Sequence, residues 1–398
     1  MLKGLKRISG KNAPAKEAGN DDARFAPLKQ LGENEQLVWI MATRYLPHPD
    51  KVSYGGEDAH FISNYGGGAI GVADGVGGWQ EAGVNPAEYS RTLIANARAY
   101  IEGTLTEFTE DELEARIEGG DIFIDPKGAL HAAHIRTKVP GSATAVVMQL
   151  SQDTQSLVAA NVGDSGFVVI RAGRIVARSR ALQHYFDCPL QFGSFPDFVE
   201  ATDTAEDADV YNERMYPGDV LVAGTDGLWD NVYDHEIISI VLRHRGAAPQ
   251  PIADDIAALA RNHASDADFY SPYIREAQSQ GLDLPWWEKL LGAGFRKGKF
   301  GLRQLSGGKQ DDITVVVAVV ATQERPPQMP PVAAAAAAAE TIAEASLKTI
   351  SRRSQRIAEA ALEEAAAQSQ SHLLAWPISQ RMEEAPLEEA AAQPPKVL

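Results

Sequence analysis

Short apolar runs rich in β-branched residues dominate the middle of this chain. Such runs, bounded by glycine or polar turn residues, predict β-strands. They are ATAVVMQL at 143–150, SLVAANV at 156–162, DVLVAG at 219–224 and ITVVVAVV at 313–320. The segment FVVIRAGRIVARS at 167–179 has the same character and predicts a hairpin that turns through Ala172 and Gly173. The centre of the protein is therefore expected to be β-sheet.

Helical patterns lie mostly before and after the strand-rich region, at residues 85–103, 235–245 and 251–264. Asn85 followed by Pro86 is a typical helix start. Because strands and helices are grouped rather than alternating, repeated parallel βαβ units are disfavoured. We predict an α/β sandwich of mainly antiparallel sheets packed face to face, with helices outside.

The patterned region is expected to form one domain over residues 36–322. Residues 1–35 are interpreted as a flexible leader, and its first sixteen residues carry five basic and no acidic side chains. This leader is either a transit segment or a basic disordered tail. Residues 323–398 are rich in Pro, Ala and Glu and predict a partly helical tail without chemistry of its own.

The composition excludes several classes of function. The chain has 37 Lys and Arg against 54 Asp and Glu, a formal net charge of -17, which argues against binding to nucleic acid or to an anionic membrane. Its one cysteine, Cys188, excludes an intrachain disulfide and a cysteine-rich zinc site. The aliphatic run 313–321 is much shorter than the roughly 20 residues of a membrane helix. We expect a monomer that binds neither nucleic acid nor membrane.

Acidic motifs stand at the ends of four expected strands. GEDAHFI (56–62) and GGKQDDITVVVAV (307–319) begin strands, whereas GVADGVGG (71–78) and GTDGLWD (224–230) end them. An Asp-Gly pair alone is equally compatible with an ordinary turn. If the strand ends converge, the clustered carboxylates need counter-ions, since desolvated like charges repel. Hard cations such as Mg²⁺ or Mn²⁺ suit an all-oxygen set, and its candidate members are Glu57, Asp58, Asp74, Asp226 and Asp311.

In this order, the four motifs together with GSATAVV (141–147) and ANVGDSGF (160–167) resemble the metal-dependent protein phosphatase 2C family. The resemblance covers roughly residues 37–321. It implies a four-layer αββα sandwich, in which two antiparallel sheets are flanked by helices. It also implies hydrolysis of phosphoserine and phosphothreonine in phosphorylated proteins, without a covalent intermediate, by water activated at a binuclear Mg²⁺ or Mn²⁺ centre.

Further stretches resemble the branch of the family often found in mitochondria and plastids, among them VADGVGGW and HYFDCPLQFG (184–193). The compartment implied is therefore one of these organelles, and the cytoplasm is the alternative.

The resemblance also implies roles for single residues. Asp74 would bridge both ions, and the carbonyl of Gly75 would bind one of them. Asp226 and Asp311 would bind the other ion and belong with Asp74 to the catalytic residues, while Glu57 and Asp58 hold metal-bound waters or ligate directly. Members of the family often bind a third, weaker ion near a flap, and Asp164 in GDSG matches the residue implicated there.

Two acidic residues beside these ligands need separate roles. Asp312 competes with Asp311 as a ligand, and the first residue of the pair aligns with the family's ligand. Asp230 is expected to cap the helix that follows GLW rather than to bind metal.

The sequence departs from better-known members of the family at two positions. Ser53 stands where they have an arginine that holds the substrate phosphate, and Lys51 is the candidate replacement. Val76 stands where they have a histidine, the proposed general acid, so His60 and His184 become candidate proton donors. These departures favour one alternative function, a catalytically weak or inactive scaffold that binds phosphoproteins.

An apparent insertion, residues 286–304, is rich in basic and aromatic side chains. It is interpreted either as a surface loop or as a basic lip that guides substrate toward the metals.

Overall fold

The computed structural model describes residues 31–105, 107–109, 111–112, 123–195, 202–284, 294–296, 299–301 and 305–325. The chain divides into two units, Met1–Pro326 and Pro327–Leu398, and all described residues lie in the first. The predictions for the tail, and for nearly all of the leader, fall outside the described residues.

Two antiparallel sheets form the centre of the first unit. Sheet A contains, in spatial order, β1 (Glu35–Leu46), β15 (Ile313–Glu324), β12 (Val220–Gly224), β6 (Gly166–Arg171) and β7 (Arg174–Arg178). Sheet B contains β11 (Asp209–Arg214), β5 (Ser156–Val162), β4 (Gly141–Ser151), β3 (Ala69–Gly75) and β2 (Ala59–Ser63), and β10 (Phe192–Ser194) also pairs with β4. Two short hairpins are separate from these sheets: β8 (Gln183–Tyr185) with β9 (Cys188–Pro189), and β13 (Gly294–Arg296) with β14 (Lys299–Gly301).

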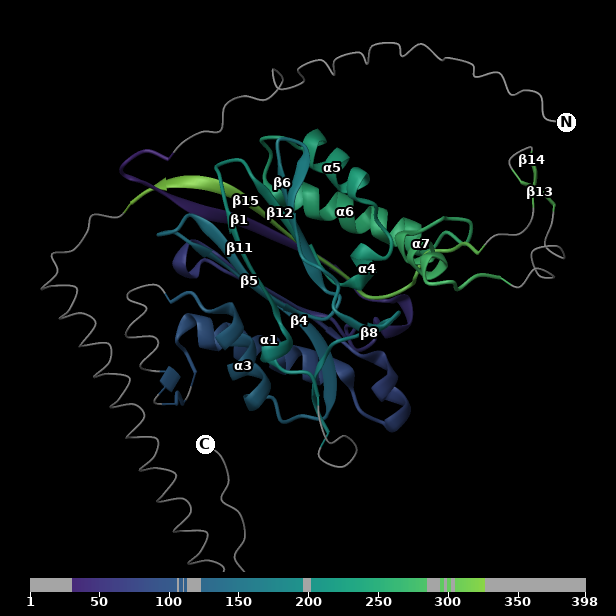
Figure 1. The fold of residues 1–398 in the computed structure, drawn as a ribbon, viewed down its shortest axis with the longest axis horizontal. Helices are drawn as coiled ribbons and strands as arrows, with labels where there is room; N and C mark the ends of the chain where they lie inside the picture. Colours follow the sequence, from purple (N-terminus) through teal and green to yellow (C-terminus); the bar gives the residue numbers. More distant parts are fainter. Residues whose placement is uncertain are drawn as a thin grey trace, which may run out of the picture. The chain divides into compact units, whose positions relative to one another are not determined.

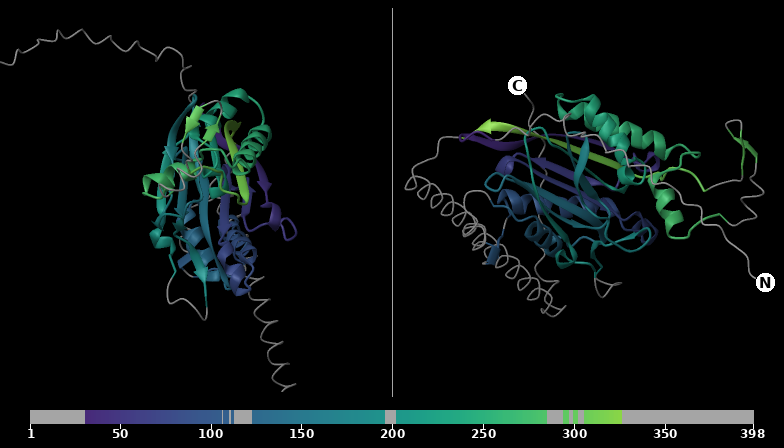
Figure 2. Two further views of the ribbon diagram at one scale, coloured as in Figure 1. Left: turned by 90° about the vertical axis from the view of Figure 1, so that its right-hand side faces the viewer. Right: turned by 45° about the horizontal axis from the view of Figure 1, so that its top comes forward.

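Helices cover both outer faces of the sandwich (Figure 1 and Figure 2). Helices α1 (Pro86–Glu102) and α3 (Pro126–Arg136) pack on sheet B, whereas α5 (Asp234–Arg243) and α6 (Pro249–Ala264) pack on sheet A. The short α4 (Asp226–Trp229) follows β12, and α7 (Pro272–Ser279) follows α6. The predicted four-layer αββα sandwich is thus confirmed. The expected helices at 85–103, 235–245 and 251–264 correspond to α1, α5 and α6, but α7 was not predicted.

The strands are apolar on both faces because each sheet is covered twice. Val315 of β15 packs with the helices on sheet A, while its neighbour Val316 lies between the sheets. In β4, Val147 packs under α1 and α3, and Val146 lies between the sheets. Burial on both faces explains why the sequence shows continuous apolar runs rather than alternation of apolar and polar residues.

The hairpin expected at Ala172 and Gly173 joins β6 to β7. Both residues have positive φ, 49° and 77°, as a two-residue turn between twisted strands requires. No helix within the described part of the chain combines the length and the apolar character needed to cross a bilayer.

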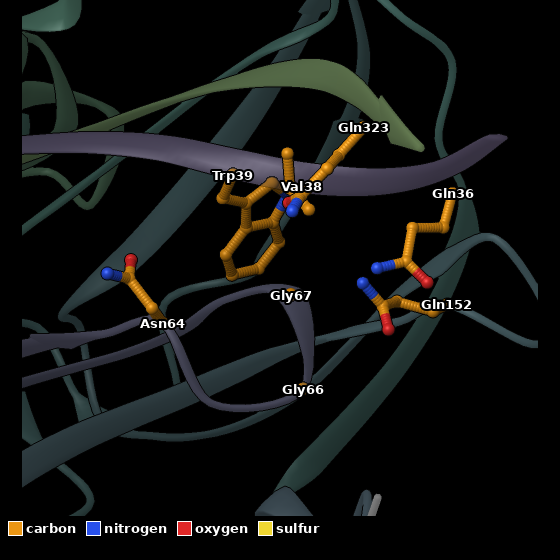
Figure 3. Close-up of a pocket in the computed structure, with 8 residues that line it drawn as sticks. All are labelled: Gln36, Val38, Trp39, Asn64, Gly66, Gly67, Gln152 and Gln323. Carbon is orange, nitrogen blue, oxygen red and sulfur yellow. The ribbon is translucent and has the colours of Figure 1, made fainter. Parts of the chain in front are cut away.

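A cavity of about 520 Å³ opens where β1 begins and β15 ends (Figure 3). Amide side chains line it, among them Gln36, Asn64 and Gln152, together with Trp39. The indole N–H of Trp39 is buried without a hydrogen-bond partner among the described residues. The acidic motif of β15 stands at the other end of that strand, so this cavity is separate from the acidic residues.

Stability should depend on the double coverage of sheet A. Ile170 of β6 is 2% exposed and packs under α5 and α6, so Ile170→Ala should lower the free energy of unfolding by about 2–5 kcal/mol. Ile40 of β1 is 52% exposed, and Ile40→Ala should cost less than about 1 kcal/mol. Urea denaturation of both variants measures the difference, and equal losses would contradict the layer assignment.

Candidate metal centre

Strand register brings the acidic motifs to one edge of the sandwich. In sheet B, Ala59 pairs with Ala73, so β2 begins where β3 ends. In sheet A, Gly224 pairs with Val315, so β12 ends where β15 begins. Figure 1 shows α4, which follows β12 directly, at this edge. Carboxylates that are distant in the sequence are therefore collected at one place.

Asp58 connects the two sheets at this edge. Its Oδ2 accepts hydrogen bonds from the hydroxyls of Thr225 (2.8 Å) and Thr314 (2.7 Å), both of which belong to the sheet A side. The residue is 4% exposed, and its Oδ1 has no hydrogen-bond partner among the described residues. Burial, followed by the nearby charge of Asp312, raises the pKa of Asp58 well above its usual value. A positive charge at Oδ1 would relieve both causes.

Asp311 and Asp312 are adjacent but held in different ways. Asp312 is buried, and its carboxylate accepts backbone N–H groups of His48 (2.6 Å) and Glu57 (2.7 Å). Its hydrogen-bonding capacity is thus used to fix the segment before β2. The side chain of Asp311 is partly exposed, and burial and the charge of Asp226 raise its pKa to about 6. This arrangement supports Asp311 as the ligand of the pair.

Asp74 and Asp226 form the middle of the centre. The two carboxyl groups influence each other: Asp226 acts to raise the pKa of Asp74, and Asp74 acts to lower the pKa of Asp226. Burial, and then repulsion from Asp58 and Asp226, raises the pKa of Asp74. Burial also acts on Asp226, but Lys309 outweighs it and lowers the pKa of Asp226. Its Oδ1 is buried without a partner among the described residues.

Lys51 lies among carboxylates on the other side of the centre. Its Nζ is 2.5 Å from Glu57 Oε2, 3.3 Å from Asp311 Oδ1 and 3.4 Å from Asp312 Oδ2. Burial opposes its charge, but these carboxylates outweigh burial and raise the pKa of Lys51. The sequence placed Lys51 at the site, and its role toward substrate stays a prediction. Ser53 is exposed.

Lys309 was not predicted, although it stands in the quoted motif GGKQDD. Its Nζ lies 2.6 Å from Asp226 Oδ2, 3.0 Å from Asp230 Oδ2 and 3.1 Å from Asp187 Oδ1. A lysine two residues before a candidate ligand, in a strongly acidic chain, is the signal that would have drawn attention to it.

The expectation that Asp230 caps the helix after GLW is wrong. Asp230 ends α4, while the residue that caps α5 is Tyr233, which forms a capping box with Glu236. The chain continues to turn through Asn231 and Val232, so α5 begins too late for Asp230 to cap it. Its side chain pairs with Lys309 instead.

Neither candidate histidine hydrogen bonds to the carboxylates of this centre within the described residues. His60 lies in β2, two residues after Asp58. The centre of its ring is 6.2 Å from that of the Tyr45 ring. Burial lowers its pKa. His184 lies on β8, is largely exposed and pairs with Asp203 at 2.9 Å. Val76 precedes the turn η4 (Gly77–Ala82) and carries no transferable proton.

Two glycines permit the close packing at this edge. A Cβ on Gly75 would come within 2.9 Å of the carbonyl oxygens of Glu57 and Pro86. A Cβ on Gly227 would lie 1.9 Å from the carbonyl oxygen of Asp312. Each Asp-Gly pair thus joins a carboxylate to a site where another backbone approaches.

The donors at this edge fit hard divalent cations. Among the described residues, no three His, Cys, Asp or Glu side chains stand as a ready-made ligand set, and two lysines pair with several of the carboxylates. The donors are all oxygen, the carboxylates outnumber the two lysines, and Asp58 and Asp226 each keep a buried, unpartnered Oδ1. Such a site suits Mg²⁺ or Mn²⁺.

The insertion at 286–304 carries β13 and β14, which pair with each other. Its side chains lie outside the described residues, so the hypothesis of a basic lip stays a prediction.

Known proteins similar to this chain are phosphatases. No family model matches it. "Probable protein phosphatase 2C 26" of Arabidopsis thaliana is 40% identical over 290 residues, which cover 73% of this chain and 86% of that protein. "Protein phosphatase PTC7 homolog" of Homo sapiens is 33% identical over 241 residues, 58% of this chain and 74% of that protein. Among solved structures, the photosystem II phosphatase PBCP is 39% identical with a TM-score of 0.59, and the match covers 71% of this chain and 98% of that one.

The two adjacent aspartates should respond differently to the same substitution. Asp312→Asn removes an acceptor for a buried backbone N–H and should cost about 1–3 kcal/mol of unfolding free energy in EDTA. Asp311→Asn should cost less than about 1 kcal/mol but weaken Mn²⁺ binding. Urea denaturation and calorimetric titration with Mn²⁺ measure the two effects. The assignment fails if Asp312→Asn has the larger effect on Mn²⁺ affinity and Asp311→Asn the larger effect on stability.

Proposed function

The chain belongs to the protein phosphatase 2C family of metal-dependent serine/threonine phosphatases, and we propose that Asp74, Asp226 and Asp311 hold the two ions for its reaction. The observation that carries this proposal is the convergence of strand ends from both sheets, with unpartnered carboxylate oxygens left at their meeting point. Phosphorylated proteins are its substrates.

The ligands would come from both sheets. Asp74 and the carbonyl of Gly75 come from sheet B, and Asp226 and Asp311 come from sheet A. Glu57 and Asp58 support them from the start of β2. When bound, Mg²⁺ or Mn²⁺ ions would activate water as the nucleophile and offset the negative charge that develops on the phosphoryl oxygens. The protein would set the positions of the ligands, because hydrogen bonds of Asp58 and Asp312 fix the two sheets relative to each other.

Lys51 is proposed to bind the substrate phosphate. Its side chain is 20% exposed, and its ammonium reaches Glu57 and Asp311. Once cations neutralise these carboxylates, the ammonium is free to pair with a phosphate dianion. A lysine offers a point charge rather than the planar fork of arginine, so it would orient the phosphate less strictly.

Protonation of the leaving group would not rest on a histidine in this chain. The Val76 side chain has no proton that it could give to a leaving group, His60 lies between the sheets, and His184 pairs with Asp203. A substrate whose leaving oxygen needs little protonation, such as an aryl phosphate, should suffer least from this arrangement.

A scaffold that binds phosphoproteins without hydrolysing them is the second candidate. Val76 and Ser53 favour it, because both replace polar groups that family members use. The unpartnered oxygens of Asp58 and Asp226 favour the enzyme, since a scaffold has no need of a buried, uncompensated metal site.

We further propose a plastid or mitochondrial location. The basic character of residues 1–16 and the likeness to a photosystem II phosphatase support it.

Activity should require both the metal and the ligand set. The purified protein should hydrolyse p-nitrophenyl phosphate and a phosphothreonine peptide with Mn²⁺, and EDTA should abolish both activities. Asp226→Asn should lower kcat by at least about two orders of magnitude. The variant should stay folded, because Lys309 keeps Asp230 and Asp187 as partners. A folded, Mn²⁺-loaded wild type that is inactive on both substrates would establish the scaffold instead.

The role of Lys51 can be separated from metal binding at saturating Mn²⁺. Lys51→Met should raise KM for an aryl phosphate about tenfold, the equivalent of one charge-assisted hydrogen bond of about 1.5 kcal/mol. Lys51→Arg should retain most of the affinity because the charge is kept. Steady-state kinetics on both variants gives the comparison, and an unchanged KM in Lys51→Met would refute phosphate binding by Lys51.

A further inference from the structure

Lys309 is enclosed by carboxylates from separate segments of the chain. Asp226 and Asp230 stand at the two ends of α4, and Asp187 lies in the turn between β8 and β9. The ammonium is within 3.1 Å of a carboxylate oxygen of each. It also lies 5.2 Å from the centre of the Tyr273 ring. This half of the acidic edge therefore already contains a cation supplied by the chain.

The charge of Lys309 also reaches Asp164. Burial and the charge of Asp226 raise the pKa of Asp164 to about 7, and Lys309 acts in the opposite direction. Asp164 and Asp226 in turn contribute to the raised pKa of Asp230, which burial dominates. These carboxylates would repel one another strongly in a buried site, and one ammonium offsets much of this repulsion.

We propose that Lys309 takes the place of a third metal ion, so that the protein holds two divalent ions and one built-in cation. The proposal rests on the proposed function for the first two ions. A third ion beside Asp164 and Asp230 would have to displace Lys309 from three carboxylates or bind beside its charge. An ammonium tethered to the chain is always present at the site, whereas a weakly held ion is not.

The geometry also explains how Lys309 can stay at the site when two ions bind beside it. It shares Asp226 with the proposed binuclear centre, while Asp230 and Asp187, its two other partners, are not among the proposed ligands of the two ions. Loss of the Asp226 contact on metal binding would leave Lys309 with two carboxylates. The lysine can thus remain in place when the two ions bind.

The test is a count of bound Mn²⁺, measured by equilibrium dialysis with elemental analysis on the full-length protein. Wild type should bind two ions and Lys309→Met three. The matched control is Lys127→Met, because Lys127 pairs with Glu206, outside the metal centre, at 2.7 Å. This control should bind two ions, as wild type does.

Further variants separate the third ion from a general loss of structure. In the Lys309→Met background, Asp230→Asn should return the count to two, because it removes a ligand of the new ion. Lys309→Arg should bind two ions, since the cation is retained. Addition of Mn²⁺ should raise Tm more in Lys309→Met than in wild type, because only that variant gains an ion.

The possible counts decide the matter even if a variant folds poorly. Three ions in wild type would overturn the proposal without any variant, and so would a count of two in folded Lys309→Met. No ion in wild type but one in Lys309→Met would uphold the role of Lys309 and refute the two-ion centre. No ion in either protein would overturn both proposals.

Discussion

The carboxylate of Asp58 is the interaction on which the rest of the site depends. It reaches from sheet B to Thr225 and Thr314 of sheet A. Asp312 makes the opposite connection, from sheet A to sheet B. It directly precedes β15, and its carboxylate accepts a hydrogen bond from the backbone N–H of Glu57, just before β2. The two sheets, which pack on each other mainly through apolar side chains, are thus joined at this edge by directional, charged hydrogen bonds. These bonds set the separation of the strand ends, and with it the positions of the acidic residues.

The same bonds create an electrostatic problem that the chain does not solve alone. Burial and mutual repulsion raise the pKa of Asp58 and Asp74, so the charged forms of these two carboxylates are disfavoured. Two charges about 4 Å apart interact by roughly 4 kcal/mol at the effective dielectric constant of a protein surface. Divalent ions bound between the carboxylates would relieve this repulsion and stabilise the fold by mass action. Metal binding and fold stability are therefore coupled through the same side chains.

The parts of the structure that local sequence determines could be predicted, and those that depend on distant contacts could not. β-Branched runs located β12 and β15, and Asn85 with Pro86 located the start of α1. The collection of acidic strand ends followed from the pattern together with the family resemblance. The partners of Asp58 could not be found, because nothing in the sequence distinguishes Thr225, which follows β12, or Thr314 of β15 until the sheets pack. Whether Asp230 could cap α5 depended on how many residues separate α4 from α5, and the helix propensities of the residues do not specify that number.

The two lysines of the acidic centre pair with different sets of carboxylates. Lys51 belongs to the loop before β2 and contacts Glu57 and Asp311, which the metal ions would neutralise. Its charge then becomes available to an incoming phosphate. Lys309 keeps Asp230 and Asp187, which the two ions do not need, so its charge stays engaged. Under the proposed function, an anionic substrate would be attracted toward Lys51, because the charge of Lys51 would be uncompensated once the ions are bound.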